Sequence, residues 1–186
     1  MIFYNHIIVL KMFYIRHAEK AYNNGSNIEF SLDPHLTDDG REAAHAKFQY
    51  LVTQYGTPSK IISSPYLRTR ETAQIAANTI FELTGTHIDI ICDHHIGEYL
   101  GHHKKKNINE CLRPETLIHN PVPPEEWKEY SYRIRTHLKY AQRDSYIWYI
   151  THGIVIKSIA FFHKNDIAYP SELEGIMIDH TGIHTI

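Results

Sequence analysis

The chain has 186 residues, enough for one domain that buries about 70% of its unfolded-chain surface. Its 19 basic and 21 acidic residues leave a formal net charge of −2, so no global field favours nucleic acid or an anionic membrane, and we expect neither as a partner. The two cysteines, Cys92 and Cys111, are too few for a disulfide framework, which fits a reducing compartment.

The first eleven residues, MIFYNHIIVLK, contain one apolar stretch, from Ile7 to Leu10. Because no basic flank precedes this stretch and no small-residue cleavage site follows it, we expect no signal peptide. No run approaches the eighteen or so apolar residues of a membrane-spanning helix, so we expect a soluble, cytoplasmic protein. We predict residues 1–11 to be an extension, which could lengthen the first strand, pair along an edge or reflect an upstream start, and residues 12–186 to be a single domain.

Strand-like and helix-like segments alternate from here on. Residues 7–15 are β-branched and aromatic, as in a strand, and a helix follows between Thr37 as N-cap and Gly56. Residues 60–63 (KIIS) form the next predicted strand. Ser63-Ser64-Pro65 then suits the start of a helix, since serine can cap and proline fits the first helical position.

The second half of the chain continues the alternation. We predict, in order, a strand at 87–93, a loop region at 97–124, a helix at 125–142, a strand at 145–151, a helix at 153–164 and two short strands around a turn at 180–182. Strands separated by helices of 10 to 18 residues predict an α/β domain whose mainly parallel sheet is flanked by helices.

Polar residues of one kind follow three of the predicted strands. Arg16 and His17 follow the first strand, the second strand leads to Arg68, and His152 follows the strand at 145–151. The carboxyl ends of parallel strands lie on one edge of a sheet, where ligands bind. Two arginines and two imidazoles gathered there would cradle a phosphoryl group without a metal ion, because a guanidinium matches the geometry of phosphate oxygens.

Two other interpretations compete with this one. A single Arg-His pair is more often a surface salt bridge beside a hydrogen-bonded histidine, and only the agreement of all three strand ends argues against that reading here. The 15 histidines, with pairs at 94–95 and 102–103, could indicate a metal centre, but neither HExxH nor CxxC accompanies them. We therefore expect no metal site and no cofactor.

At these residues the chain resembles the histidine phosphatase superfamily, in its phosphoglycerate-mutase-like branch. Arg16-His17-Ala18 resembles the family's RHG motif, LTDDGREAA its LTxxGxxQA, SSPYLRTRETA its SSPxxRAxxTA and THG at 151–153 its late HG motif. The likeness runs from about Met12 to the end, in the family's order. It implies a phosphoglycerate-mutase-like fold of three layers, with a mixed, mainly parallel sheet between helices.

The resemblance implies a role for each matching residue. It makes His17 the nucleophile that becomes phosphohistidine, and Glu98, in IGEYLG, the proton donor. The resemblance also implies a phosphate clamp, made of Arg16, Asn23, Arg68 and His152.

Elementary electrostatics agrees with these roles. An imidazole attacks only when it is neutral, and nearby arginines are expected to lower the pKa of His17. A carboxylic acid that faces a phosphate dianion keeps its proton, so Glu98 could protonate the leaving alkoxide and later accept a proton from water.

The chain departs from the family pattern at two positions. Ala18 replaces the usual glycine, and Lys20 stands where many relatives carry serine or threonine. Lys20 could add a cation for a more anionic substrate. The run GHHKKKN, with His102, His103 and Lys104, is either a solvated loop or a rim that attracts an anionic substrate.

The leading functional hypothesis is a metal-independent phosphomonoesterase that acts on a phosphorylated small molecule or a phosphoprotein. A mutase of the phosphoglycerate type is the first alternative, although only about 27 residues separate Glu98 from Glu125, which favours an open site and water as the acceptor. A non-catalytic phosphoryl-binding domain is the second alternative, and a histidine-rich metal protein the third.

Overall fold

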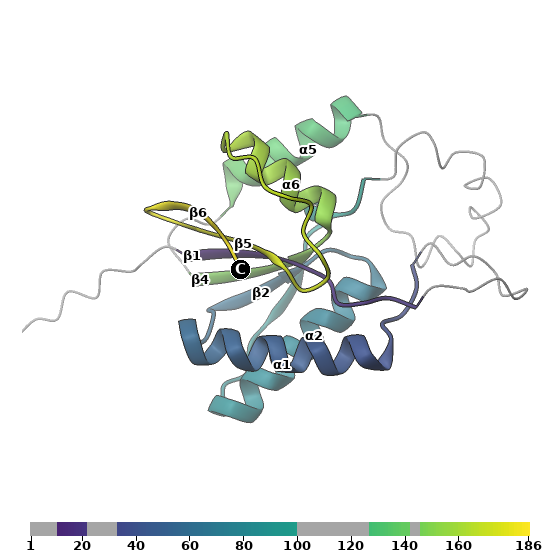
Figure 1. Ribbon diagram of the computed structural model, residues 1–186, viewed down its shortest axis with the longest axis vertical. Helices are drawn as coiled ribbons and strands as arrows, with labels where there is room; N and C mark the ends of the chain where they lie inside the picture. Colours follow the sequence, from purple (N-terminus) through teal and green to yellow (C-terminus); the bar gives the residue numbers. More distant parts are fainter. Residues whose placement is uncertain (1–10, 22–32, 100–126, 142–145) are drawn as a thin grey trace, which may run out of the picture.

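The computed structural model describes residues 11–21, 33–99, 127–141 and 146–186 (Figure 1). Within these residues one sheet has the strand order β3-β2-β4-β1-β5-β6. The strands are β1 (Lys11–Arg16), β2 (Lys60–Ser63), β3 (Ile90–Cys92), β4 (Tyr146–Thr151), β5 (Gly175–Asp179) and β6 (Gly182–Thr185). Strands β3, β2, β4 and β1 are parallel, whereas β5 and β6 are antiparallel to their neighbours. The predicted mainly parallel, mixed sheet is confirmed.

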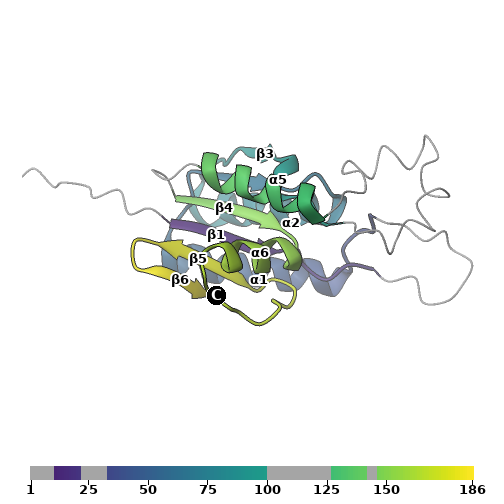
Figure 2. The same cartoon turned by 90° about the horizontal axis from the view of Figure 1, so that it is seen from above.

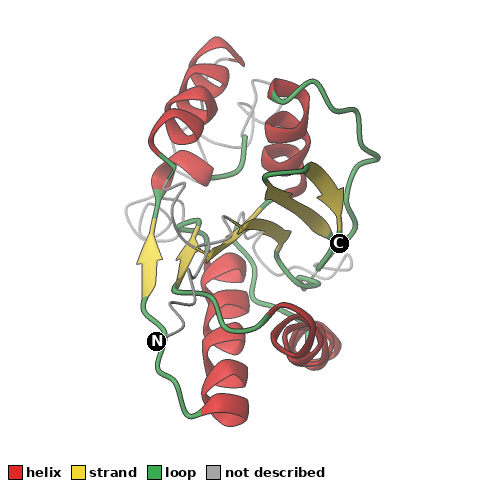
Figure 3. Ribbon diagram, turned by 90° about the vertical axis from the view of Figure 1, so that its left-hand side faces the viewer, coloured by secondary structure: helices red, strands yellow, loops and turns green. Residues whose placement is uncertain are grey.

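Helices cover both faces of the sheet, so the described domain has three layers (Figures 1 and 2). One face carries α1 (Asp38–Tyr55) and α2 (Leu67–Thr84), and the other carries α5 (Trp127–Tyr140) and α6 (Gly153–Phe162). Figure 3 shows the same layers from the side, with the strands between the helices. The predicted α/β architecture is therefore confirmed.

The alternation of side chains along the central strands builds two cores. On β1, Phe13 and Ile15 face the core beneath α1 and α2, whereas Met12 and Tyr14 face the core beneath α5 and α6. The neighbouring strand β4 alternates in the same way. Since both faces are buried, these strands are nearly continuous apolar runs, which is why their sequences predict strands so strongly.

The boundaries of α1 follow from its end residues. Thr37 is the N-cap, and its Oγ1 accepts a hydrogen bond from Gly40 N–H at 2.9 Å. At the other end Gly56 has a φ of 81°, a left-handed conformation that glycine adopts without steric cost. Both end residues were predicted from sequence.

The remaining predicted elements are present with adjusted bounds. Strand β3 is shorter than the predicted 87–93, and a 3₁₀ turn, η1 (His94–Ile96), follows it. The described part of the first strand starts at Lys11, so the predicted extension lies almost entirely outside the described residues, as does most of the predicted loop at 97–124. None of the described helices is both long enough and apolar enough to cross a membrane.

Candidate active site

The three polar strand ends meet at one edge of the sheet, because β2, β4 and β1 are adjacent and parallel. Hydrogen bonds continue past the ends of the strands: His17 N–H donates to the carbonyl of Thr151 at 3.0 Å, and Ser64 N–H donates to the carbonyl of Ile150 at 2.9 Å. These bonds fix the backbone of His17 relative to the ends of the neighbouring strands. The sequence-based prediction that these segments share one edge is confirmed.

His17 is buried and held as one tautomer. Its Nδ1 lies 2.7 Å from the carbonyl oxygen of Ala18, so Nδ1 carries the proton and donates it. Its Nε2 then has a lone pair and accepts a hydrogen bond from Arg68 Nε at 3.2 Å. Burial first, and the charge of Arg68 second, hold the pKa of His17 well below its ordinary 6.5. His17 therefore presents an unprotonated nitrogen whose lone pair, among the described residues, accepts only the hydrogen bond from Arg68, and a nucleophile requires such an unprotonated nitrogen.

Arg68, on the first turn of α2, is the centre of the site and is completely buried. Besides Nε on His17, its Nη1 donates to Asp33 Oδ1 at 3.1 Å. Its Nη2 donates to Glu98 Oε2 and lies 3.4 Å from Nδ1 of His152. Among the described residues, one guanidinium thus contacts His17, Glu98 and His152, and its geometry suits a phosphoryl group held beside His17.

His152, the N-cap of α6, is also buried and neutral. Its Nδ1 accepts from Arg68, so Nε2 carries the proton and donates to Ser64 Oγ at 2.8 Å. Burial, followed by the charge of Arg68, lowers the pKa of His152 well below 6.5. The rings of His152 and His17 meet edge to face, with centroids 5.4 Å apart. Neutral imidazoles let both histidines lie next to the guanidinium without charge repulsion.

Glu98 reaches the site from the turn after β3, and its side chain is 23% exposed. Its Oε2 contacts Arg68 and lies 4.0 Å from Nδ1 of His152. Two residues hold this turn: Thr151 Oγ1 donates to the carbonyl of Ile96 at 2.6 Å, and Arg133 Nη1 donates to three carbonyls, including that of Gly97 at 3.1 Å. The Glu98 side chain therefore lies beside the buried guanidinium of Arg68 and is itself partly exposed to solvent.

Arg16 lies differently from Arg68. Its Nη1 donates to the carbonyl of Pro170 at 2.8 Å, and its Nη2 donates to Glu172 Oε1 at 2.6 Å. Its charge is still close enough to contribute to the lowered pKa of His17. Arg16 is thus at the site, as predicted, but its guanidinium is paired with the segment that leads into β5.

The other predicted residues divide into two groups. Lys20 is described: its backbone bridges to Leu36, and its charge contributes to the lowered pKa of both site histidines, so it lies near them. Asn23, His102, His103 and Lys104 lie outside the described residues, and their predicted contacts stay predictions.

Asp33 is a site residue that the sequence analysis missed. Its carboxylate is almost completely buried, accepts from Arg68 Nη1, and accepts from Leu67 N–H at 2.7 and 2.8 Å. The expected cap of α2 by Ser64, with Pro65 at the first helical position, is wrong: Tyr66 is the N-cap without a side-chain cap bond, and Asp33 takes the orphan N–H of Leu67. No local pattern could reveal this, because the partners are 34 and 35 residues apart. Asp33 therefore holds Arg68 through Nη1, which leaves Nε and Nη2 to the other site residues.

The short segment after His17 is held by the two helices below the sheet. Ala18 N–H donates to Thr72 Oγ1 of α2 at 3.1 Å, and Thr37 N–H, at the start of α1, donates to the carbonyl of Glu19 at 3.0 Å. A Cβ on Gly40 would lie 2.5 Å from that same carbonyl oxygen, so the glycine of LTDDG permits the close approach. The motif residues of α1 and α2 therefore position His17.

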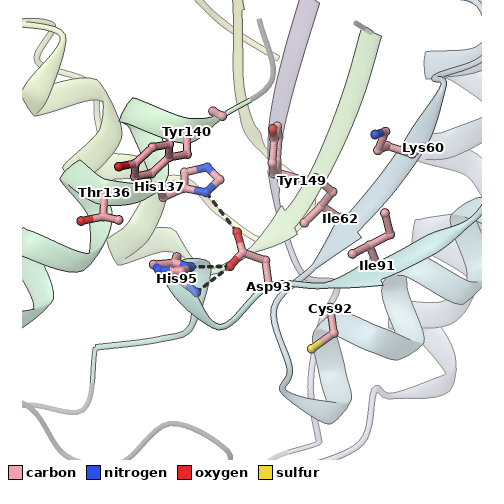
Figure 4. A pocket seen from close by; sticks show the side chains of 11 residues that line it. Lys60, Ile62, Ile91, Cys92, Asp93, His95, Thr136, His137, Tyr140 and Tyr149 are labelled. Carbon is pink, nitrogen blue, oxygen red and sulfur yellow. Dashed lines mark hydrogen bonds and ion pairs between the residues drawn. The ribbon is translucent and has the colours of Figure 1, made fainter.

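A cavity of about 330 Å³ lies away from these residues, between α5 and strands β2 and β3 (Figure 4). Asp93 lines this cavity. Its carboxylate is hydrogen-bonded to the ring of His95 and lies 3.1 Å from Nδ1 of His137. None of the motif residues lines this cavity. Among the described residues there is also no group of three or more His, Cys, Asp or Glu side chains that could hold a metal ion. The cluster around Arg68 is therefore the better candidate for an active site.

Comparison with known proteins identifies the family and the fold of the chain. A family model, the histidine phosphatase superfamily (branch 1), matches residues 12–183. No curated protein sequence matches the chain. Similar solved structures include the mycobacterial glucosyl-3-phosphoglycerate phosphatase (18% identity, 96% of each chain, TM-score 0.62) and the phosphoglycerate mutase of Bacillus anthracis (15% identity, 96% of this chain and 92% of that one, TM-score 0.62). A protein of Agrobacterium tumefaciens assigned as the phosphohistidine phosphatase SixA is similar over 95% of each chain (14% identity, TM-score 0.63). At these identities the structural likeness establishes the fold.

Proposed function

The chain belongs to the histidine phosphatase superfamily, and from that membership we propose that it is a phosphomonoester hydrolase that works through a phosphohistidine on His17. The observation that carries the proposal is the Nε2 lone pair of His17, held in a buried site against the guanidinium of Arg68. A nucleophile and a phosphate-binding cation are thus in contact before any substrate arrives.

In the first step Nε2 of His17 attacks the phosphorus atom, an N–P bond forms, and the bond from phosphorus to the ester oxygen breaks. Glu98 enters this step as the carboxylic acid and gives its proton to the leaving oxygen. The charge on the transferred phosphoryl group is stabilised by Arg68 and His152, and further by Arg16 and Asn23.

In the second step a water molecule attacks the phosphohistidine. The carboxylate of Glu98 takes a proton from that water, the N–P bond breaks, inorganic phosphate leaves, and the electron pair returns to Nε2. The contact of the Glu98 carboxyl group with Arg68 supports this role in both proton transfers. The arginines supply the positive charge, so we propose that no divalent ion takes part.

The substrate class follows from what these residues can recognise. The residues proposed for the site would recognise a phosphoryl group and no other part of a substrate, so we propose a phosphorylated small molecule or a phosphoprotein as substrate. The near balance of 19 basic and 21 acidic residues supports a local anion site and not a nucleic-acid surface.

The test is hydrolysis of p-nitrophenyl phosphate by the full chain, with and without EDTA, from about pH 4.5 to about pH 8. Because the pKa of His17 is lowered, its imidazole stays neutral as the pH falls through 6.5, so we expect the acid limb of kcat/KM to lie well below pH 6.5. EDTA should have no effect. Folded protein without turnover, or turnover lost to EDTA, would overturn the proposal.

Replacement of Glu98 with glutamine should separate proton donation from binding. p-Nitrophenolate leaves without a proton, whereas an alkoxide needs one. We therefore expect the rate constant of the first step to fall by about 10²- to 10⁴-fold with glycerol 2-phosphate and much less with p-nitrophenyl phosphate. The measurement is single-turnover kinetics on both esters. Equal losses on the two esters would contradict the assignment of Glu98 as the acid.

A further inference from the structure

We propose that Tyr66 is a further catalytic residue, whose hydroxyl donates a hydrogen bond to a phosphoryl oxygen of the substrate. The inference rests on the proposed function, since it assigns a new contact in the same site. It starts from an unusual feature: the Tyr66 hydroxyl is a buried polar atom to which nothing in the described part of the chain is hydrogen-bonded.

A buried hydroxyl without a partner is costly. Leaving such a group unpaired keeps the full penalty of removing it from water, so buried polar atoms almost always have partners. The Tyr66 side chain has no exposed surface at all, so solvent does not satisfy it. Phenylalanine would fill nearly the same volume without this cost. We therefore infer that the hydroxyl serves as a hydrogen-bond donor to a ligand.

The position of Tyr66 places the ring inside the candidate active site. It is the N-cap of α2, two residues before Arg68, and its ring lies under the guanidinium of that arginine at 4.6 Å from the centroid. The ring also meets that of His152 edge to face at 5.0 Å. Tyr66 therefore packs against two of the groups that hold the phosphoryl group in the proposed reaction.

The charged groups around the hydroxyl show from which side a substrate can approach. The charges of Glu98, Arg68 and Asp33 all affect the pKa of the Tyr66 hydroxyl. Arg68 and Asp33 are buried and form an ion pair with each other. Glu98 is the partly exposed member, and its carboxylate lies on Arg68 Nη2. A phosphoryl group that displaces Glu98 from Nη2 would enter beside the Tyr66 ring, which lies against the same guanidinium.

The protonation state of Tyr66 suits a donor. Burial, and then the negative charge of Glu98, raise the pKa of its hydroxyl far above 10. The group therefore keeps its proton through the whole range in which the enzyme would work. It can give a hydrogen bond to a phosphoryl oxygen without adding a charge that would oppose the arginines.

The test compares Tyr66→Phe with Tyr14→Phe as a matched control. Tyr14 is another fully buried tyrosine, but its hydroxyl is hydrogen-bonded to His137 Nε2 at 3.0 Å. Tyr14 lies on the face of the sheet that α5 and α6 cover, whereas α2 covers the other face. For Tyr66→Phe we expect kcat/KM for p-nitrophenyl phosphate to fall about 10- to 100-fold and inorganic phosphate to bind more weakly, with the urea midpoint of unfolding unchanged or higher. For Tyr14→Phe we expect the opposite pattern, with the midpoint lowered and kcat/KM unchanged.

Three outcomes would overturn the inference. Tyr66→Phe could retain wild-type kcat/KM and phosphate affinity, it could lose activity together with stability as a structural residue does, or the wild type could bind no inorganic phosphate. Failure of the proposed function looks different. A wild type without turnover that still binds phosphate, and binds it less tightly after Tyr66→Phe, would refute the hydrolase while supporting the contact.

Discussion

Replacement of His17 with alanine should reduce the hydrolysis of p-nitrophenyl phosphate by a factor on the order of 10⁴ or more, which leaves no measurable turnover. The reason is that the Nε2 lone pair of His17 is the only proposed acceptor of the phosphoryl group, and a water molecule in its place would lack both the position and the nucleophilicity. The measurement is kcat/KM with the folded variant, checked by circular dichroism.

A surface histidine provides the matched control for this change. His45 is partly exposed and pairs with Glu82 between α1 and α2, far from any residue proposed for the reaction. His45→Ala should leave kcat/KM unchanged. If His17→Ala kept a tenth or more of the wild-type rate, covalent catalysis by His17 would be refuted.

Replacement of Arg68 with methionine should have the second large effect, and on two properties at once. We expect kcat/KM to fall on the order of 10³-fold or more, because this guanidinium, bonded to His17, is the group that we propose holds the phosphoryl group. We also expect the free energy of unfolding to fall by about 3–5 kcal/mol, because Asp33 would be left as a buried charge without its cationic partner. Urea denaturation and steady-state kinetics measure the two effects.

Arg70 is the control for this substitution. It lies two positions further along α2 and is exposed, as its place on another helix face predicts. Arg70→Met should change neither property by more than a small factor. A stable, active Arg68→Met protein would contradict the central place of Arg68 in the site.

The parts of the fold that were predictable are those determined by neighbours in sequence. The nearly continuous apolar runs of β1 and β4, and the end residues Thr37 and Gly56 of α1, act over a few positions, so the sequence shows them directly. The gathering of His17, Arg68 and His152 followed from one further rule, that parallel strands end at a common edge. Those predictions needed no knowledge of side-chain contacts.

The residues that were not predictable act across long separations. Asp33 is 35 residues from Arg68, and Arg133 is 36 residues from the carbonyl of Gly97 that it binds. Neither pairing leaves a local pattern, because a buried ion pair and a backbone contact of this kind depend on how the helices pack. Sequence reasoning therefore found the groups proposed to react but missed the groups that hold them.

Arg16 shows the same limit in another way. Its place at the end of the first strand was predicted, with Arg16 now the last residue of β1, yet its bond with Glu172 joins positions 156 residues apart and could not be foreseen. That pair is partly exposed, with side-chain exposures of 16% and 31%, in contrast to the buried pair of Arg68 and Asp33. Exposed ion pairs are worth little in free energy, so a phosphate dianion can compete with Glu172 for this arginine.

The central claim is that the phosphoryl group passes through His17. The most direct test is to mix the full chain with p-nitrophenyl phosphate, stop the reaction in alkali, where phosphohistidine survives, and locate the modification by mass spectrometry of the peptides. We predict one phosphoryl group on the peptide that contains His17, formed and lost at rates compatible with turnover, and none in His17→Ala. Turnover without a labelled His17, or a phosphoryl group on another residue, would contradict the account.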